Sequence, residues 1–310
     1  MPITRATRQA RRTRGRRGHD STVATPDGGL LGVTSYGTVD APGERRVLVV
    51  GGAFITALIY RPFALRLSQA LGDGWAVDVF DRRGRGKSSE QPPNYAMSTE
   101  ISDVAAVLRE TGARNLFGHS LGGAVVLNAV QAFQGHDGDG ASADPELVPD
   151  RLAVYDPAIN IEGSLNSSWM RACVREIEAG RTARALAIMH RGQQRTATLS
   201  KVPVPLLAGL LAAATRTPFG RTARKLVTSG TGELLAALEE VESVEDFAGL
   251  PPNTRFMAGA RSASYFQETA RQLHAAVRGS TYTESPDGLH GSVPAAVTEL
   301  VDDIAAYFRG

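Results

Sequence analysis

One serine in this sequence stands in a setting that suits nucleophilic attack. Ser120 lies at the centre of residues 118–122, which have the form Gly-x-Ser-x-Gly. Glycine two positions before and after a serine lets a strand end and a helix start approach each other closely at a sharp turn. Such a turn presents the hydroxyl at the tip of a sheet, next to a helix N-terminus that stabilises negative charge. The pattern therefore predicts Ser120 as a nucleophile.

A serine hydroxyl needs a base that takes its proton, and histidine is the usual one. The chain has six histidines. His290 lies between glycines in the loop 287–291, after an expected strand, where its ring is free to turn toward Ser120. The other five lie in the N-terminal tail, beside the serine, in an expected insertion, in an expected cap and on a helix face: His19, His119, His136, His190 and His274. We therefore predict His290 as the general base.

The serine must be held by a strand before it and a helix after it. The apolar run 115–117 is typical of a short buried strand, and 124–133 has a helical pattern without Pro or Gly. Further strands are expected at 21–25, 30–36, 46–50, 76–80, 152–155, 254–258 and 280–283, and the first two form a hairpin. Further helices are expected at 59–71, 98–111, 265–277 and 292–308, with Ser98 and Ser292 as N-caps.

This alternation of strands and helices predicts an α/β protein with a mostly parallel, doubly wound sheet, whose catalytic groups lie at the carboxyl ends of the strands. The segment between the strands at 152–155 and 254–258 is too long for a loop and contains only helical patterns. We expect a helical cap there, inserted between strands six and seven. The predicted organisation is a basic tail at 1–20, a core at 21–156 and 253–310, and the cap at 157–252.

Composition narrows the classes of function. Seven arginines lie in the first eighteen residues, but no aromatic residue is interleaved with them and no apolar stretch follows, so neither nucleic-acid binding nor an export signal is indicated. The longest apolar run, 202–214, is too short to span a bilayer. The single cysteine, Cys173, excludes an intramolecular disulfide, and Asp137 and Asp139 lack the spacing of a calcium loop. We expect a cytoplasmic protein that acts on a small molecule without a metal or cofactor.

Four segments of the chain resemble, in the same order, those of the α/β-hydrolase fold family. They are Gly51-Gly52-Ala53-Phe54 after a strand, Asp81–Ser88 in the form Asp-x-Arg-Gly-x-Gly-x-Ser, the Ser120 turn and the His290 loop. The resemblance extends from about residue 23 to residue 308. It implies a structural role for Asp81 and Arg83 in their turn.

The resemblance also implies an oxyanion hole. Its donors would be the main-chain N–H groups of Leu121 and Ala53, with that of Phe54 as the alternative to Ala53. We place Phe54 and His119 among the residues that bind substrate.

The acid that would orient His290 is absent from its usual place. Most members of the family carry Asp after the seventh strand, where this chain has no carboxylate between Ala258 and Ser264. Some relatives, including zearalenone-type lactone hydrolases, carry the acid after the sixth strand, where this chain has Asp156. The resemblance therefore implies Asp156 as the acid. Glu162, Glu268 and the absence of any acid are the alternatives.

Together these residues predict a serine hydrolase. Ser120 would attack the carbonyl of an ester, lactone or thioester, and the apolar cap favours an uncharged, fairly hydrophobic substrate. Carbon–carbon bond hydrolysis and cofactor-free peroxidase-like activity use the same scaffold and stay open, as does a ligand-binding protein without catalysis. Epoxide hydrolases and haloalkane dehalogenases have Asp as the nucleophile, so Ser120 argues against both.

Overall fold

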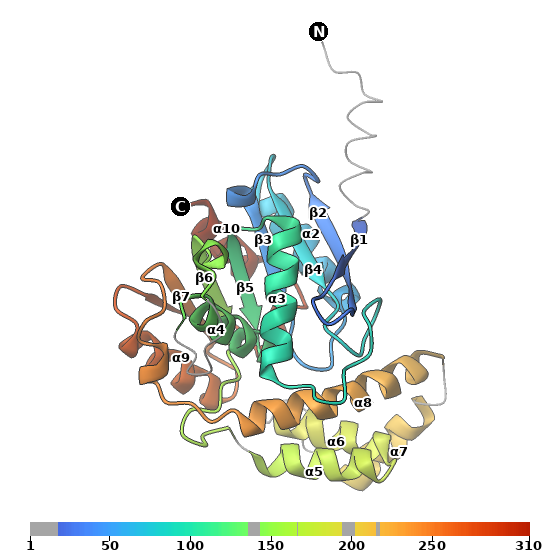
Figure 1. The fold of residues 1–310 in the computed structure, drawn as a ribbon. Helices are drawn as coiled ribbons and strands as arrows, with labels where there is room; N and C mark the ends of the chain where they lie inside the picture. Colours follow the sequence, from blue (N-terminus) through green and yellow to red (C-terminus); the bar gives the residue numbers. More distant parts are fainter. Residues whose placement is uncertain (1–17, 136–142, 166, 194–201, 215–217) are drawn as a thin grey trace.

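One sheet runs through the middle of the molecule (Figure 1). The structure, a computed structural model, describes residues 18–135, 143–165, 167–193, 202–214 and 218–310, and within them eight strands form the sheet. The strands are β1 (His19–Ala24), β2 (Leu30–Gly37), β3 (Arg46–Val50), β4 (Ala76–Phe80), β5 (Asn115–His119), β6 (Arg151–Tyr155), β7 (Thr254–Gly259) and β8 (Thr281–Ser285). Most of the tail, 1–17, and the insertion with His136, Asp137 and Asp139 lie outside the described residues.

The strands follow the spatial order β1-β2-β4-β3-β5-β6-β7-β8. β1 pairs with β2 as the expected hairpin, β2 is antiparallel to β4, and all later pairs are parallel. The carboxyl ends of β3 to β8 therefore meet at one edge. The predicted mostly parallel, doubly wound sheet is confirmed.

Helices cover both faces of the sheet because its central strands are apolar on both sides. In β3, Val47 and Val49 pack toward α2 (Ala57–Leu71) and α10 (Thr298–Arg309). Leu48 and Val50 pack on the opposite face, toward α3 (Met97–Thr111), α4 (Leu121–Phe133) and α9 (Ser264–Ala276). This alternation follows from the two-residue period of a strand. Short 3₁₀ turns are η1 (Gly43–Arg45), η2 (Pro145–Leu147), η4 (Glu245–Phe247) and η5 (His290–Ser292).

Among the described residues between β6 and β7, four helices form the expected cap. They are α5 (Ser167–Glu178), α6 (Thr182–Gln193), α7 (Val204–Ala214) and α8 (Pro218–Glu239). Figure 1 shows them together beyond the carboxyl ends of the strands, with α8 nearest the core. Among the described residues, no helix has both the length and the apolar character needed to cross a membrane.

Two predicted helix starts are wrong. α3 begins at Met97 with Ala96 as its N-cap, and Thr99 Oγ1 accepts a hydrogen bond from the Ala96 N–H, so Ser98 lies inside the first turn. α10 begins at Thr298 and not at Ser292, because Ala296 adopts a positive φ of 54° that interrupts the helix. Ser292 instead closes the turn η5, where its Oγ accepts a hydrogen bond of 2.8 Å from the Leu289 N–H.

Candidate active site

Ser120 occupies a strained turn between β5 and α4. Its φ of 57° lies in a region that side-chain-bearing residues rarely adopt. A Cβ at Gly118 would lie 2.6 Å from a methyl carbon of Val126, and a Cβ at Gly122 would overlap the carbonyl oxygen of Val50. Both glycines are therefore required for the strand end and the helix start to meet. The turn leaves Ser120 at the carboxyl edge of the sheet, 8% exposed.

His290 and Asp156 come together with Ser120 at this edge. The Nε2 of His290 lies 3.0 Å from Ser120 Oγ, and its Nδ1 lies 3.1 Å from Asp156 Oδ2. Ser120 follows β5, Asp156 follows the neighbouring β6, and His290 lies in the loop after β8. The alternative acids, Glu162 and Glu268, are exposed on the surface. The arrangement places a hydroxyl within hydrogen-bond reach of one imidazole nitrogen and a carboxylate within reach of the other, which is the geometry that nucleophilic catalysis by serine requires.

The Asp156 carboxylate is fully buried and is held by the segment after β7. Its Oδ1 accepts a hydrogen bond of 3.0 Å from the Gly259 N–H, and its Oδ2 accepts one of 2.6 Å from the Ser262 hydroxyl. These donors satisfy the buried charge. Sequence reasoning missed Ser262. Its signal was a hydroxyl in the segment where the family usually carries the acid.

The imidazole of His290 is in contact with two other rings. Phe266 of α9 stacks on it with ring centroids 4.3 Å apart and an interplanar angle of 11°. The ring of His119 lies on it at 5.0 Å and 38°. These contacts restrict the ring to the orientation that faces Ser120.

His119, which the sequence analysis placed among the substrate-binding residues, has both ring nitrogens bonded within the protein. It is 1% exposed, and its Nε2 lies 2.9 Å from the carbonyl oxygen of His290. A carbonyl only accepts, so Nε2 carries hydrogen. Burial and the nearby His290 hold the pKa of His119 well below its usual value, so the ring is neutral and Nδ1 is an acceptor. The ring offers no atom to a substrate.

Tyr60 completes this hydrogen-bonded chain. Its hydroxyl donates to His119 Nδ1 over 2.6 Å and accepts a bond of 2.8 Å from the Gly52 N–H. The loop after β3 is thus connected through two buried rings to the backbone of His290. Tyr60, on α2, had no sequence signal that separated it from other buried tyrosines.

The loop after β3 lies directly against the serine. A Cβ at Gly52 would lie 3.4 Å from Ser120 Oγ. Ala53 follows Gly52, and Leu121 follows Ser120 as the first residue of α4. Within the described residues, neither the Ala53 N–H nor the Leu121 N–H has a main-chain acceptor. Phe54, with a positive φ of 60°, packs its ring against α8, where a Cβ at Gly230 would overlap it.

The turn after β4 is held by its own charged residues. Asp81 accepts hydrogen bonds of 2.8 Å from the Ala57 N–H and 3.0 Å from the Lys87 N–H. Arg83 pairs with Asp103 and Asp27 at 2.7 and 2.6 Å. Asp81 and Arg83 therefore stabilise the conformation of the turn.

Other candidate groups lie away from Ser120. Burial raises the pKa of Cys173, on α5, to about 11, so it is no thiolate nucleophile. Among the described residues, no group of three or more His, Cys, Asp or Glu side chains could hold a metal ion.

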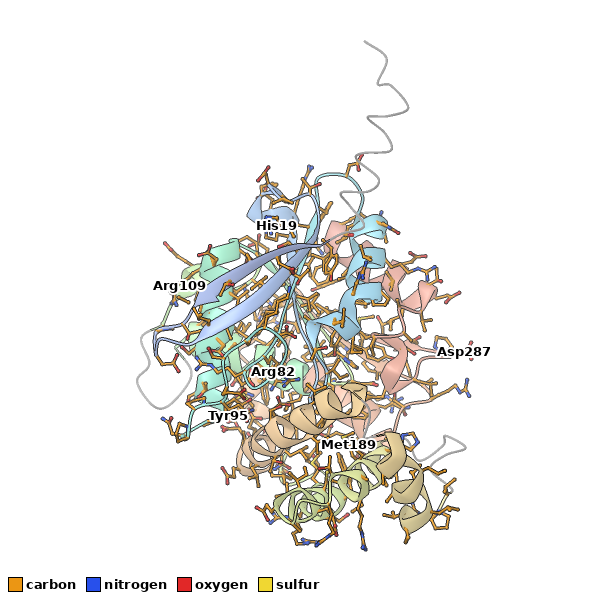
Figure 2. All side chains as sticks on the ribbon, turned by 90° about the vertical axis from the view of Figure 1, so that its right-hand side faces the viewer. His19, Arg82, Tyr95, Arg109, Met189 and Asp287 are labelled. Atoms are coloured by element: carbon orange, nitrogen blue, oxygen red, sulfur yellow. The ribbon has the colours of Figure 1, made fainter. Side chains whose placement is uncertain are left out.

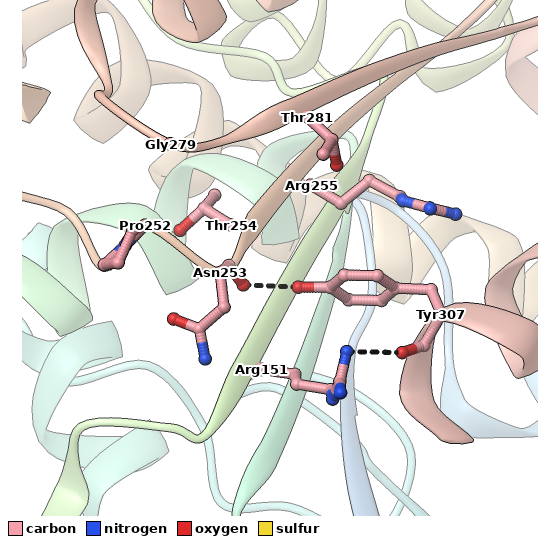
Figure 3. A pocket seen from close by; sticks show the side chains of 8 residues that line it. All are labelled: Arg151, Pro252, Asn253, Thr254, Arg255, Gly279, Thr281 and Tyr307. Atoms are coloured by element: carbon pink, nitrogen blue, oxygen red, sulfur yellow. Dashed lines mark hydrogen bonds between the residues drawn. The ribbon is translucent and has the colours of Figure 1, made fainter. Parts of the chain in front are cut away.

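A cavity of about 460 Å³ opens at the opposite, amino-terminal edge of the sheet (Figure 3). It is lined by Arg151, Pro252, Asn253, Thr254, Arg255, Gly279, Thr281 and Tyr307.

The chain is similar to known proteins in both sequence and fold. The model of the alpha/beta hydrolase family matches residues 47–302. No curated protein sequence matches the chain. Among solved structures, an alpha/beta hydrolase from Sphaerobacter thermophilus is 25% identical with a TM-score of 0.67, over 93% of this chain and 100% of that one.

Two further solved structures show the same fold. An esterase from Exiguobacterium antarcticum is 16% identical with a TM-score of 0.66, over 94% of this chain and 100% of its own. An enol-lactonase from Burkholderia xenovorans is 16% identical with a TM-score of 0.61, over 94% of this chain and 100% of its own.

Proposed function

This chain is a hydrolase that belongs to the alpha/beta hydrolase family, and we propose that it cleaves an ester, lactone or thioester through an acyl-enzyme on Ser120. One observation carries the proposal. An unbroken line of hydrogen bonds runs from Ser120 Oγ through the His290 ring to Asp156, with lengths of 3.0 and 3.1 Å.

The carboxylate decides which nitrogen of His290 acts as the base. Asp156 only accepts hydrogen bonds, so Nδ1 carries hydrogen and Nε2 offers its lone pair to the Ser120 hydroxyl. As Oγ attacks the carbonyl carbon, its proton passes to Nε2, and the charged imidazole is stabilised by Asp156.

The resulting oxyanion would lie between the N–H groups of Ala53 and Leu121. When the intermediate collapses, the bond to the leaving oxygen or sulfur breaks, and that atom takes the proton from His290 Nε2. The acyl group stays on Ser120. Water, deprotonated by the same nitrogen, then attacks the acyl carbon and releases the acid and the serine hydroxyl.

Aromatic side chains favour an uncharged, fairly hydrophobic small molecule as the substrate. The ring of Phe54 extends from the loop after β3 against α8 of the cap, and Phe266 lies against His290. Such surfaces bind apolar groups close to the reacting carbonyl. The esterase and the enol-lactonase of the same fold are consistent with this class of bond.

A substrate panel tests this function. Purified protein is assayed with p-nitrophenyl esters of increasing chain length and with a set of lactones, and Ser120→Ala is the control. We expect turnover of at least one series with a burst of the first product, and none with Ser120→Ala. A folded wild-type protein that turns over neither series would instead favour ligand binding without catalysis.

A further inference from the structure

Two arginines and two carboxylates are buried together where the core meets the cap. Arg82 and Arg85 come from the turn after β4, Glu100 from α3 and Glu233 from α8. Each is at most 2% exposed. Figure 2 shows Arg82 on the side of the core that faces the cap, near Tyr95. Charged side chains are rarely buried this deeply unless they are paired.

The two arginines hold the loop that carries the proposed oxyanion donor. Arg82 Nη1 donates a hydrogen bond of 3.1 Å to the Gly51 carbonyl. Arg85 Nη1 donates to the carbonyls of Gly52 and Ile55, over 3.1 and 2.8 Å. Because these three carbonyls lie on both sides of Ala53 and Phe54, the guanidinium groups fix the direction of the peptides between them.

The two carboxylates offset the positive charge of the arginines, one from α3 and one from α8. Glu100 binds Arg82 through Oε1 and Oε2 over 2.6 and 2.9 Å. Glu233 is in direct contact with Arg85 Nη2 and lies 3.9 Å from Arg82 Nη1. Burial and the charge of Arg82 lower the pKa of Arg85 to about 10, whereas Glu100 raises the pKa of Arg82 despite its burial, so both arginines are charged at neutral pH. Glu233 is the carboxylate in direct contact with Arg85, whereas Glu100 bonds Arg82 and acts on Arg85 only through its charge.

Small residues on α8 allow Glu233 to reach this position. A Cβ at Gly84, in the turn, would lie 2.5 Å from Ser229 Cβ. A Cβ at Gly230 would overlap Phe54, and one at Gly232 would lie 2.8 Å from Gln91 Oε1. α8 therefore packs closely on both loops, and the carboxylate of Glu233 enters the core only when the cap is in this place.

We propose that Glu233 is a positioning residue of the oxyanion hole: from the cap it holds Arg85 and Arg82 on the carbonyls around Ala53. This inference rests on the proposed function. If Glu233 has this role, the position of α8 and the geometry of the oxyanion hole depend on each other. Catalysis would then depend on a cap residue that touches neither the substrate nor the three catalytic side chains.

The neighbouring Arg83 supplies a matched control. Arg83 belongs to the same turn and pairs with the buried carboxylate of Asp103 at 2.7 Å. Its other partners are Asp27 and Thr25, near the β1–β2 hairpin, and not the loop after β3. A purely structural role of buried ion pairs would affect both sites alike.

The experiment compares kcat and KM for one p-nitrophenyl ester, with thermal unfolding as a check on folding. Glu233→Gln is expected to lower kcat about tenfold to hundredfold with KM within about threefold, because loss of one oxyanion donor has effects of this size or larger. Asp103→Asn is expected to lower the unfolding temperature but to keep kcat within about threefold. The double variant Arg85→Met, Glu233→Met removes the whole pair without leaving a lone charge, and we expect it to fold and still lose kcat.

The outcomes separate this inference from the proposed function. Full kcat in the folded double variant, or equal loss of kcat in Glu233→Gln and Asp103→Asn, would overturn the positioning role while the hydrolase stands. A wild-type protein without turnover would overturn the proposed function and this inference with it.

Discussion

Asp156 Oδ2 lies 3.1 Å from His290 Nδ1, although Asp156 follows β6 and not β7. This contact is possible because β6 lies directly between β5 and β7. A carboxylate at the end of β6 is therefore beside the serine and within reach of the His290 loop. The segment after β7, which would otherwise carry the acid, supplies two donors to it, the Gly259 N–H and the Ser262 hydroxyl. Geometry and charge, and not the strand of origin, qualify a residue for this role.

The first prediction concerns the acid itself. Asp156→Asn should lower kcat by about 10⁴-fold, because an amide can stabilise the wrong tautomer of His290 and cannot stabilise its charge. Glu162→Gln, at an exposed position, should leave kcat within about twofold. Steady-state kinetics on one ester measures both. Equal losses would refute Asp156 as the acid.

The second prediction concerns Ser262. Its hydroxyl donates the 2.6 Å bond to the buried Asp156 carboxylate, and hydrogen bonds to charged groups are the stronger ones. Ser262→Ala should therefore lower kcat about tenfold, and Ser262→Thr, which keeps the hydroxyl, should recover most of it. Ser264→Ala, at the exposed start of α9, is the control. A Ser262→Ala protein with wild-type kcat would show that the bond does not matter for catalysis.

The third prediction concerns pH and stability. Burial raises the pKa of Glu242 to about 8 from its usual 4.5, and Glu240 and Asp246 add to the effect. A carboxyl with a raised pKa in the folded state contributes stability that is fully present below about 4.5 and lost as the pH rises through about 8.

Glu242→Gln stays neutral at every pH. The variant should match the wild type near pH 5 and exceed its free energy of unfolding by about 1–3 kcal/mol near pH 9. Urea unfolding at both pH values measures this, with the exposed Glu245→Gln as the control. A gain near pH 5 that vanishes near pH 9 would reverse the sign and contradict the assignment.

The fourth prediction sets helix propensity against packing. Alanine favours the helical conformation over glycine by about 1 kcal/mol, so propensity alone favours Gly→Ala in the interior of a helix. At Gly230 the new methyl group would overlap the Phe54 ring, so Gly230→Ala should lower the free energy of unfolding by about 1–3 kcal/mol. At Gly209, on α7, an added Cβ would meet no described atom within 4 Å outside the backbone of its own helix, and Gly209→Ala should raise the free energy of unfolding by about 0.5–1 kcal/mol. Effects of the same sign at both positions would show that α8 does not pack as described.

The sequence alone predicted those structural features whose physical cause lies within a short segment of the chain. The glycines around Ser120 and the apolar runs of the central strands predicted the turn and the parallel sheet. The position of Asp156 at the carboxyl edge followed from its place at the end of an expected strand, and its proposed role came from the family resemblance. Such features depend on neighbours only a few residues away.

Other features depend on groups that are distant in the sequence. The chain from Gly52 through Tyr60 and His119 to His290, and the contact of Glu233 with Arg85, exist only after α2, α8 and the loops have packed. The expected helix start at Ser292 failed for a related reason. The loop that presents His290 takes up residues through Ala296, whose positive φ no local pattern indicated.

Covalent labelling of Ser120 tests the central claim most directly. A fluorophosphonate transfers its phosphonyl group to a serine only where a base and an oxyanion hole activate the hydroxyl. Wild-type protein treated with the probe should gain the mass of one phosphonyl group, located by peptide mass spectrometry on Ser120, and Ser120→Ala should gain none. A folded wild-type protein that stays unlabelled, or a label that persists in Ser120→Ala, would contradict the assignment of Ser120 as the nucleophile.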